Sequence, residues 1–269
     1  MQIIGHRGAR GLWPENTLAG FQRAMNSGVK AFELDVNLTR DRVVVVTHDA
    51  QLNYEITQYR NGEWLMESDL RSIRLTNYED IRQYGVGQIR PNSNYAKTFP
   101  NQQEIVGQKI PTLSDVLTLV CDRAAVTIEV KSFDDDLEVI VAPQIFVDCL
   151  QQVIESVTTP WDDITISSFD WRVLEAVHEI MPGIPTAALT EKHNEQYIDV
   201  VAQVKNIGAT TWSPEYTDLN QHLVDRAHSI GLKVVTWTVN DPKSIELLEK
   251  MGVDGVITDY PCKVSSLTL

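Results

Sequence analysis

The stretch AFELDVNLTRDRVVVVTHD at residues 31–49 decides the predicted fold, because it places two strand-like runs unusually close together. The runs are residues 31–36 and 43–47, and about six residues around Asp41 join them. A parallel crossover usually needs a dozen or more residues, so we expect 43–47 to return beside 31–36 as an antiparallel hairpin. An extended loop that keeps 43–47 in the wall of the sheet is the alternative.

Short β-branched runs alternate with helical patterns along the rest of the chain. The further predicted strands are residues 2–5, 125–130, 164–168, 185–189, 209–212, 233–238 and 255–258. This alternation predicts parallel βα units. With 43–47 set aside as the hairpin strand, eight parallel strands remain, the number in a (β/α)8 TIM-type barrel. The predicted fold class is therefore α/β, with this barrel as its architecture.

The helical segments between the strands carry recognisable end signals. Residues 15–28 end on a glycine, and residues 241–252 have proline near their start and glycine at their end. In residues 114–122 we expect Ser114 to cap the helix N-terminus. These signals support helical connections between parallel strands.

Residues 50–110 break this rhythm. The segment is rich in Asn, Gln, Tyr and Arg, is too long for an ordinary connection, and contains one short helical pattern at 67–75. We expect residues 1–269 to form a single barrel domain, with 50–110 as a small inserted subdomain after the second strand and its hairpin. The insertion then rests over one end of the barrel, either as a lid or specificity wall or as a solvated decoration.

Composition narrows the classes of partner. The 23 Lys and Arg residues against 37 Asp and Glu residues give a net charge of −14, so the average surface repels nucleic acid and anionic membranes. No stretch approaches the ~20 apolar residues of a membrane span, and the N-terminus lacks a signal-peptide pattern. We therefore expect a cytoplasmic protein with a small-molecule substrate. Its three cysteines, Cys121, Cys149 and Cys262, are expected to stay reduced.

Acidic side chains gather at the ends of two predicted strands. Alternation places Glu33 and Asp35 on one face of their strand, and Glu129 shares a face with Lys131 on another. Barrel enzymes place their reacting groups at the C-terminal ends of strands, and carboxylates that converge there repel one another unless a cation lies between them. Hard oxygen ligands favour Mg²⁺ or Ca²⁺. The acidic run 133–138 is better explained as a helix N-terminus.

Two histidines also end predicted strands. His6 follows the first strand beside Arg7, and His48 follows the hairpin strand beside Asp49. A hairpin in register brings His48 to the level of the carboxylates, where two imidazoles suit a displacement at phosphorus, one as base and one as acid. Arg7 and Lys131 provide positive charge for phosphate oxygens. A solvated helical position explains the other histidines, His178, His193, His222 and His228.

These residues lie in motifs that resemble the glycerophosphodiester phosphodiesterases of the phospholipase-C-like phosphodiesterase superfamily. The motifs are GHRG at 5–8, PENT at 14–17, ELD at 33–35, HD at 48–49, EVK at 129–131, SFD at 168–170, WTVN at 237–240 and GVDGVITDYP at 252–261. They occur in the family's order and span nearly the whole chain except the insertion. The resemblance implies a TIM-type barrel that hydrolyses glycerophosphodiesters to sn-glycerol 3-phosphate and an alcohol.

The same resemblance implies roles for the matched residues. It implies three ligands for one Mg²⁺ or Ca²⁺ ion, Glu33, Asp35 and Glu129. It implies an acid/base pair, His6 and His48, with the division of labour left open, and two phosphate contacts, Arg7 and Lys131.

Further matched residues surround this centre. Phe169 and Trp237 resemble aromatic residues that pack against the glycerol moiety, with ordinary barrel packing as the alternative. Glu15, Asn16 and Asp49 are expected to support the site, although PENT also fits a proline turn before a helix.

One departure from the family pattern concerns the substrate's alcohol. After the HD motif the family commonly continues with an arginine and a threonine pair, whereas this chain has AQLNYEITQYRNGEW at 50–64. The identity of the alcohol therefore stays open. Two rival functions also stay open, a phospholipase-D-like hydrolase of lysophospholipids on the same scaffold and a non-catalytic barrel that binds a phosphorylated metabolite.

Overall fold

The structure, a computed structural model, describes residues 1–132, 141–157, 160–191 and 199–262. Its centre is one nine-stranded sheet in which eight strands run parallel and close into a barrel through the pairing of β1 with β2. The strands are β1 (Gln2–Gly5), β2 (Ala31–Leu38), β3 (Val44–Val46), β4 (Ala125–Val130), β5 (Ile164–Ser168), β6 (Thr186–Thr190), β7 (Thr211–Pro214), β8 (Lys233–Thr236) and β9 (Gly255–Thr258). The predicted TIM-type barrel is confirmed.

The hairpin prediction is also confirmed. β3 pairs antiparallel with β2, with Val36 opposite Val46, and the Thr47 amide donates to the Asp35 carbonyl at 3.0 Å. β3 therefore lies beside β2 outside the closed barrel, and the alternative that placed 43–47 in the barrel wall is wrong. The short connection leaves no room for the crossover that a parallel pairing needs.

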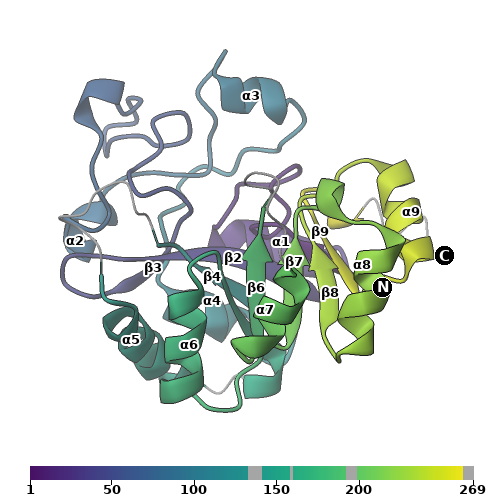
Figure 1. Cartoon of the computed structure of the whole chain (residues 1–269). Helices are drawn as coiled ribbons and strands as arrows, with labels where there is room; N and C mark the ends of the chain where they lie inside the picture. The colour runs from purple at the N-terminus through teal and green to yellow at the C-terminus, as the bar shows by residue number, and fades with distance from the viewer. Residues whose placement is uncertain (133–140, 158–159, 192–198, 263–269) are drawn as a thin grey trace.

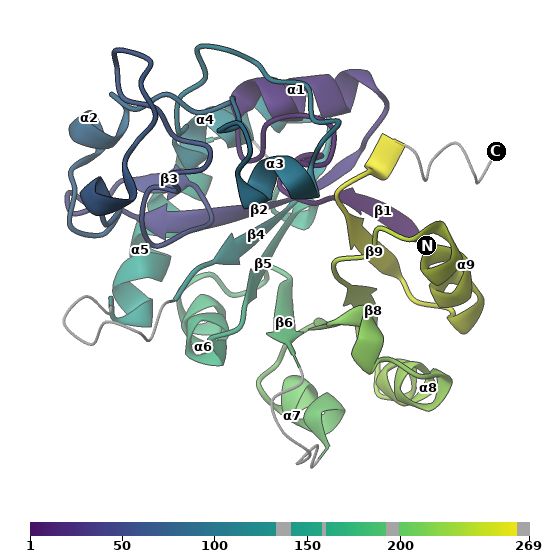
Figure 2. The same cartoon turned by 90° about the horizontal axis from the view of Figure 1, so that it is seen from above.

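Helices cover the outside of the barrel between successive strands (Figure 1 and Figure 2). These are α1 (Leu18–Asn26), α4 (Leu113–Val120), α5 (Pro143–Ser156), α6 (Trp171–Ile180), α7 (Val200–Asn206), α8 (Gln221–Ser229) and α9 (Pro242–Met251). The main core lies between them and the outward face of the strands, where β-branched side chains such as Val126, Ile128 and Ile166 are buried. The strands' alternation thus assigns one face to this core and leaves the other for the barrel interior.

The predicted end signals of α9 are observed, whereas the predicted cap of α4 is not. Asp241 caps α9 through the Ser244 amide, and Gly252 ends it in the left-handed conformation with φ 82°. The predicted cap at Ser114 is wrong, because α4 begins at Leu113 and Thr112 is its cap. Thr112 and Asp115 form a reciprocal capping box there, which binds two backbone amides where Ser114 could bind one.

Residues 50–110 pack above the barrel around a small apolar cluster that they share with Val45 of β3 (Figure 1). The cluster residues are Val45, Leu52, Leu65, Ile73, Ile81 and Ile110. The segment holds α2 (Tyr78–Ile81), α3 (Asn94–Thr98) and a single 3₁₀ turn at Glu67–Asp69, so the helical pattern predicted over 67–75 is mostly wrong. Backbone and side-chain hydrogen bonds within the loops replace regular elements in this segment.

The remaining sequence predictions concern the other histidines, the acidic run 133–138, the cysteines and membrane-spanning helices. His178 lies in α6, and His222 and His228 lie in α8. The run 133–138 and His193 fall outside the described residues. No disulfide joins Cys121, Cys149 and Cys262 in the part of the chain that the structure describes. No helix there is both long and apolar enough to cross a bilayer.

Candidate active site

The turn after β1 positions the first group of site residues. A Cβ atom on Gly5 would lie 1.9 Å from the Gly8 carbonyl oxygen, so the turn requires glycine at this position. Arg7 takes the left-handed conformation with φ 51°, and its backbone amide donates to Glu33 Oε2 at 3.0 Å. The strain of that conformation is typical of functional sites, and here it aims the Arg7 side chain at two carboxylates. Arg7 Nη1 lies 2.9 Å from Glu15 and Nε lies 3.1 Å from Asp35.

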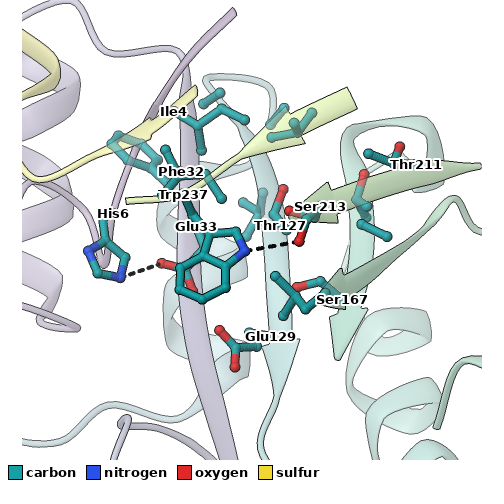
Figure 3. A pocket seen from close by; sticks show the side chains of 18 of the residues that line it. Ile4, His6, Phe32, Glu33, Thr127, Glu129, Ser167, Thr211, Ser213 and Trp237 are labelled. Carbon is teal, nitrogen blue, oxygen red and sulfur yellow. Dashed lines mark hydrogen bonds and ion pairs between the residues drawn. The ribbon is translucent and has the colours of Figure 1, made fainter. Parts of the chain in front are cut away.

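Three carboxylates meet at the C-terminal ends of β2 and β4. Glu33 and Asp35 extend from β2, and Glu129 stands opposite Asp35 in the parallel register with β4. One oxygen of each lies within 4.8 Å of the others, and the side chains of all three residues are buried. Figure 3 shows Glu33 and Glu129 at the cavity, with His6 beside Glu33. The strand register therefore brings together the acidic residues that the sequence separates by almost one hundred positions.

Two cations and one amide hold this cluster from the sides. Lys131 Nζ lies 3.0 Å from Asp35 Oδ1 and forms a second ion pair with Glu129. Asn16, with φ 52°, donates from Nδ2 to Asp35 Oδ2 at 2.9 Å. Because Asp35 receives most of these partners, it is the best stabilised anion of the three.

The titration behaviour of the carboxylates follows from this unequal support. Burial and repulsion from Asp35 and Glu129 raise the pKa of Glu33 well above its ordinary value. Burial also raises the pKa of Glu129, although Lys131 opposes it. Burial acts in the same direction on Asp35, but Arg7 and Lys131 outweigh it and hold its pKa far below the usual range. The cluster thus contains more negative charge than the protein's own cations neutralise.

The donor set fits a divalent cation. Glu33 Oε1 is buried and has no hydrogen-bond partner among the described residues, which is unfavourable for a carboxylate oxygen unless something else satisfies it. Three buried carboxylates from two strands are the oxygen ligands that Mg²⁺ and Ca²⁺ take in proteins. A bound cation would also remove the repulsion that raises the pKa of Glu33.

Each histidine of the site is held by a carboxylate at Nδ1. His6 Nδ1 lies 2.6 Å from Asp259, and Asn240 donates to the other Asp259 oxygen at 2.6 Å. His48 Nδ1 lies 2.7 Å from Asp49. This arrangement leaves Nε2 of both rings for other partners, and His6 Nε2 lies 3.8 Å from Glu33 Oε2. Both residues line the same cavity.

The environment of His6 favours its neutral form. Burial lowers the pKa of His6 and outweighs the opposing hydrogen bond to Asp259. Burial acts to raise the pKa of Asp259, but the hydrogen bond with His6 and the charges of His6 and Arg10 lower it on balance. An ionised Asp259 beside a neutral imidazole keeps the proton on Nδ1 and leaves Nε2 able to accept one.

An aromatic pair lies at the mouth of the cavity. The rings of Phe169 and Trp237 meet edge to face, with centroids 5.4 Å apart and planes at 87°. Trp237 Nε1 donates to the Ser213 carbonyl at 2.9 Å, which fixes the indole, while Phe169 is 43% exposed. An exposed phenyl ring against an anchored indole provides an apolar surface for part of a ligand.

Three residues near this centre receive no role from the sequence analysis. Asp259 and Asn240 lie in the motifs GVDGVITDYP and WTVN, but the motifs do not reveal which side chain reaches His6. Tyr95 of α3 donates its hydroxyl to Glu15 Oε2 at 2.7 Å. No local signal in residues 50–110 points to that contact, because it joins side chains 80 positions apart.

Comparisons with known proteins agree on one family. The sequence profile of the glycerophosphoryl diester phosphodiesterase family matches residues 6–263. The glycerophosphodiester phosphodiesterase of Caldanaerobacter subterraneus is 30% identical over 260 residues, which cover 96% of this chain and 94% of that protein. The chain is thus similar to these enzymes over nearly its full length.

Solved structures show the same fold. A Silicibacter pomeroyi protein, named provisionally as a glycerophosphoryl diester phosphodiesterase, superposes with a TM-score of 0.92 at 32% identity, covering 99% of this chain and 92% of its own. A phosphodiesterase from Oleispira antarctica, solved in complex with its product sn-glycerol-3-phosphate, has a TM-score of 0.78 at 22% identity, covering 100% and 96%. At that lower identity the likeness concerns the fold.

Proposed function

The chain belongs to the glycerophosphoryl diester phosphodiesterase family, and from that membership we propose that His6 and His48 carry out the acid/base chemistry of its hydrolysis with one divalent cation. The chain is an enzyme of this family, and hydrolysis of glycerophosphodiesters is its activity. The products in this proposal are sn-glycerol 3-phosphate and an alcohol. The Oleispira antarctica neighbour, which was solved with sn-glycerol-3-phosphate as its product, supports that assignment.

One observation carries the proposal. Glu33, Asp35 and Glu129 gather their oxygens within 4.8 Å, in a cavity that two carboxylate-anchored histidines also line. In the proposal these three residues hold Mg²⁺ or Ca²⁺. When bound, the cation supplies Lewis-acid polarisation of the phosphoryl oxygens.

The two histidines divide the proton transfers. The anchored Nδ1 atoms leave Nε2 of His6 and of His48 directed at the substrate, where one ring withdraws a proton from the attacking oxygen and the other donates one to the leaving oxygen. The neutral state that burial favours suits His6 as the acceptor, but the assignment of acid and base is not part of the proposal.

The remaining residues of the site bind and orient the substrate. Arg7 and Lys131 place a guanidinium and an ammonium beside the carboxylates, where they stabilise the charge that grows on phosphoryl oxygens. Phe169 and Trp237 pack against the glycerol moiety. Glu15 and Asn16 hold Arg7 and Asp35 in place, and Asp49 orients His48 in the same way. We further propose that residues 1–269 act as one catalytic domain, with 50–110 as its insertion.

Turnover of glycerophosphodiesters by histidine variants tests the acid/base assignment. We expect His6→Ala and His48→Ala each to lower kcat by at least ~100-fold, because each removes a proton carrier. Circular dichroism should match the wild type. His228→Ala is the control, because His228 pairs with Asp254 on the surface and should leave kcat unchanged. Wild-type turnover in either site variant would exclude that histidine as a proton carrier.

A substrate panel tests the rival functions. Glycerophosphocholine and glycerophosphoglycerol should be hydrolysed faster than a lysophospholipid, and EDTA should abolish turnover until Mg²⁺ or Ca²⁺ is restored. Faster turnover of the lysophospholipid would replace the proposed substrate class. Binding without any turnover would favour a phosphometabolite-binding barrel, and full activity in EDTA would remove the cation from the mechanism.

A further inference from the structure

The interior of the barrel continues the active-site cavity toward the opposite end of the strands. One cavity of about 800 Å³ is lined by His6, Lys131 and Trp237 at the C-terminal ends of strands and by Ala31 and Ala125 at the N-terminal ends. The interior of such barrels is ordinarily filled by layers of bulky branched side chains. We call the part below Glu33 and Glu129 the barrel lumen; its inward hydroxyl-bearing strand residues are Thr127, Thr165, Ser167, Thr211 and Ser213. Thr210, which precedes β7 at the far end, also lines the cavity, but its hydroxyl donates to the Thr186 carbonyl at 2.9 Å.

Small side chains keep the lumen open. The inward positions include Ala31, Ala125 and Ala187, whereas Ile4 and Ile257 from β1 and β9 form a small apolar cluster on the same interior face. Inward Thr127, Ala125 and Thr165 remain partly exposed, while outward Val126 and Ile128 on the same strand as Thr127 are fully covered. The accessible surface thus lies inside the barrel, which makes the lumen a space that small molecules can enter.

Hydroxyl groups on the two faces of the strands differ in their bonding. Those on the outward face bond to the protein, as Thr236 does to the Pro214 carbonyl at 2.7 Å and Ser168 to the Val130 carbonyl at 2.9 Å. Among the described residues, the lumen hydroxyls of Thr127, Thr165, Ser167, Thr211 and Ser213 form no hydrogen bond to protein. Figure 3 shows four of them, Thr127, Ser167, Thr211 and Ser213, around the cavity. Groups of this kind take their partners from water or from a ligand.

The uppermost lumen hydroxyl groups lie on residues that are strand neighbours of the carboxylates. Thr127 pairs with Glu33 in the register of β2 and β4, and Ser167 pairs with Glu129 in that of β4 and β5. A phosphodiester bound at the cluster therefore has one of its two ester-linked groups beside the lumen. Below the cluster the charged residues Asp162, Asp163 and Lys233 lie at the far rim, and the wall between is uncharged, with hydroxyl groups set among apolar side chains such as Ile4, Val235 and Ile257.

We propose that the lumen binds the alcohol portion of the glycerophosphodiester and favours an uncharged polyol there, such as glycerol or inositol. This inference rests on the proposed function and adds the class of alcohol to it. A polyol offers several hydroxyl groups to a wall of unpartnered hydroxyl groups. A quaternary ammonium group prefers aromatic faces instead, and the exposed Phe169 ring and the partly buried Trp237 ring lie at the mouth of the cavity rather than in the lumen.

Steady-state kinetics on two substrates test the inference. We expect glycerophosphoglycerol to have a higher kcat/KM than glycerophosphocholine. Thr127→Val and Thr211→Val, which replace a hydroxyl by a methyl group of similar size, should each lower kcat/KM for glycerophosphoglycerol about three- to tenfold. The value for glycerophosphocholine should change less than twofold. Ala125→Leu, which narrows the lumen far from the carboxylates, should shift the ratio in the same direction.

Thr186→Val is the matched control, because its hydroxyl lies on the outward face and bonds to His178 Nε2 at 3.0 Å. It should leave the ratio of the two kcat/KM values unchanged, and circular dichroism should report a native fold for every variant. An unchanged ratio in both lumen threonine variants would mean that the lumen holds water alone and would overturn the inference. Absence of hydrolysis of both substrates by the wild type would instead overturn the proposed function.

Discussion

At the scale of single residues, the site depends on carboxylates that orient imidazoles. The Asp49 carboxylate holds His48 from the adjacent position, whereas Asp259 reaches His6 from the other end of the sequence. Asn240 and Arg10 hold Asp259 in turn. A ring fixed at Nδ1 presents Nε2 in one orientation, so these anchors would set the geometry of the proton transfers that we propose for His6 and His48.

Asp259→Asn should lower kcat roughly 100-fold or more, because the amide can present its NH₂ group to His6 and stabilise the wrong tautomer. The substrate KM should change little, since Asp259 contacts no proposed phosphate ligand. Asp254→Asn is the control, as that carboxylate pairs with His228 at the surface. A kcat within threefold of wild type in Asp259→Asn would contradict the positioning role.

At the scale of secondary-structure elements, α3 of the 50–110 segment supports the turn after β1. Tyr95 binds Glu15, and Glu15 in turn binds Arg7. The Arg10 guanidinium lies over the Phe99 ring, 4.5 Å from its centroid. Burial acts to raise the pKa of Glu15, but Arg7 and Arg10 outweigh it and keep the carboxylate ionised. The segment thus takes part in placing the proposed phosphate contact.

Tyr95→Phe should raise KM about three- to tenfold with a smaller effect on kcat, because Arg7 loses part of its support. The inhibition constant of inorganic phosphate should rise by a similar factor, which a loss of stability alone would not produce. Tyr59→Phe is the control, since that hydroxyl binds the exposed Asp69 at 2.6 Å. Equal effects of both substitutions would exclude a specific link from Tyr95 to the site.

The start of α6 gives a prediction of pH dependence. Burial acts to raise the pKa of Asp170, but hydrogen bonds from Arg172 and Ser132 outweigh it and place the pKa below the ordinary 3.8. A carboxylate with a lowered folded-state pKa stabilises the fold in full above its unfolded-state pKa. That stabilisation declines as the pH falls below 3.8 and is lost once the pH passes the folded-state value.

Asp170→Asn should therefore cost about 0.5–1 kcal/mol in the free energy of unfolding at pH 7, because the amide still caps the helix but lacks the charge that pairs with Arg172. Urea unfolding of both proteins at pH 7 and at pH 3 measures the difference. We expect the difference to shrink at the lower pH. A constant difference would show that the charge of Asp170 does not contribute.

At the scale of the whole molecule, barrel closure concentrates negative charge in a protein that is already acidic overall. Excess acidic residues give a net charge of −14, and the site adds three buried carboxylates to one small volume. Barrel strands β2 and β4 impose this proximity, since Asp35 and Glu129 are register partners. The fold therefore retains local repulsion that a bound cation would relieve, and in the proposal this couples cation binding to stability.

Mg²⁺ or Ca²⁺ at about one hundred times its Kd should stabilise the fold by about 2.7 kcal/mol, equivalent to a rise in Tm of roughly 5–10 °C. Differential scanning calorimetry with the cation and with EDTA measures this without any substrate. Glu33→Gln should abolish the rise. Glu246→Gln, at an exposed ion pair with Lys250, should preserve it. A wild-type Tm independent of both cations would contradict the metal site.

The sequence by itself determined what local periodicity and chain length can encode. The short connection near Asp41 favoured a hairpin over a strand in the barrel wall, and alternation placed Glu33 and Asp35 on a common face. The order of the motifs identified the family, and with it most residues around the cluster. A local rule failed at the start of α4, where Ser114 is the predicted cap and the structure has a capping box between Thr112 and Asp115.

Only the tertiary structure decided which distant side chains meet. The bond from Asp259 to His6, the contact from Tyr95 to Glu15 and the open lumen all depend on barrel closure and on the packing of 50–110 against the turn after β1. No short stretch encodes them, because the width of the lumen depends on inward side chains of all eight strands together. Periodicity tells which face a residue occupies, whereas three-dimensional packing decides what lies across from it.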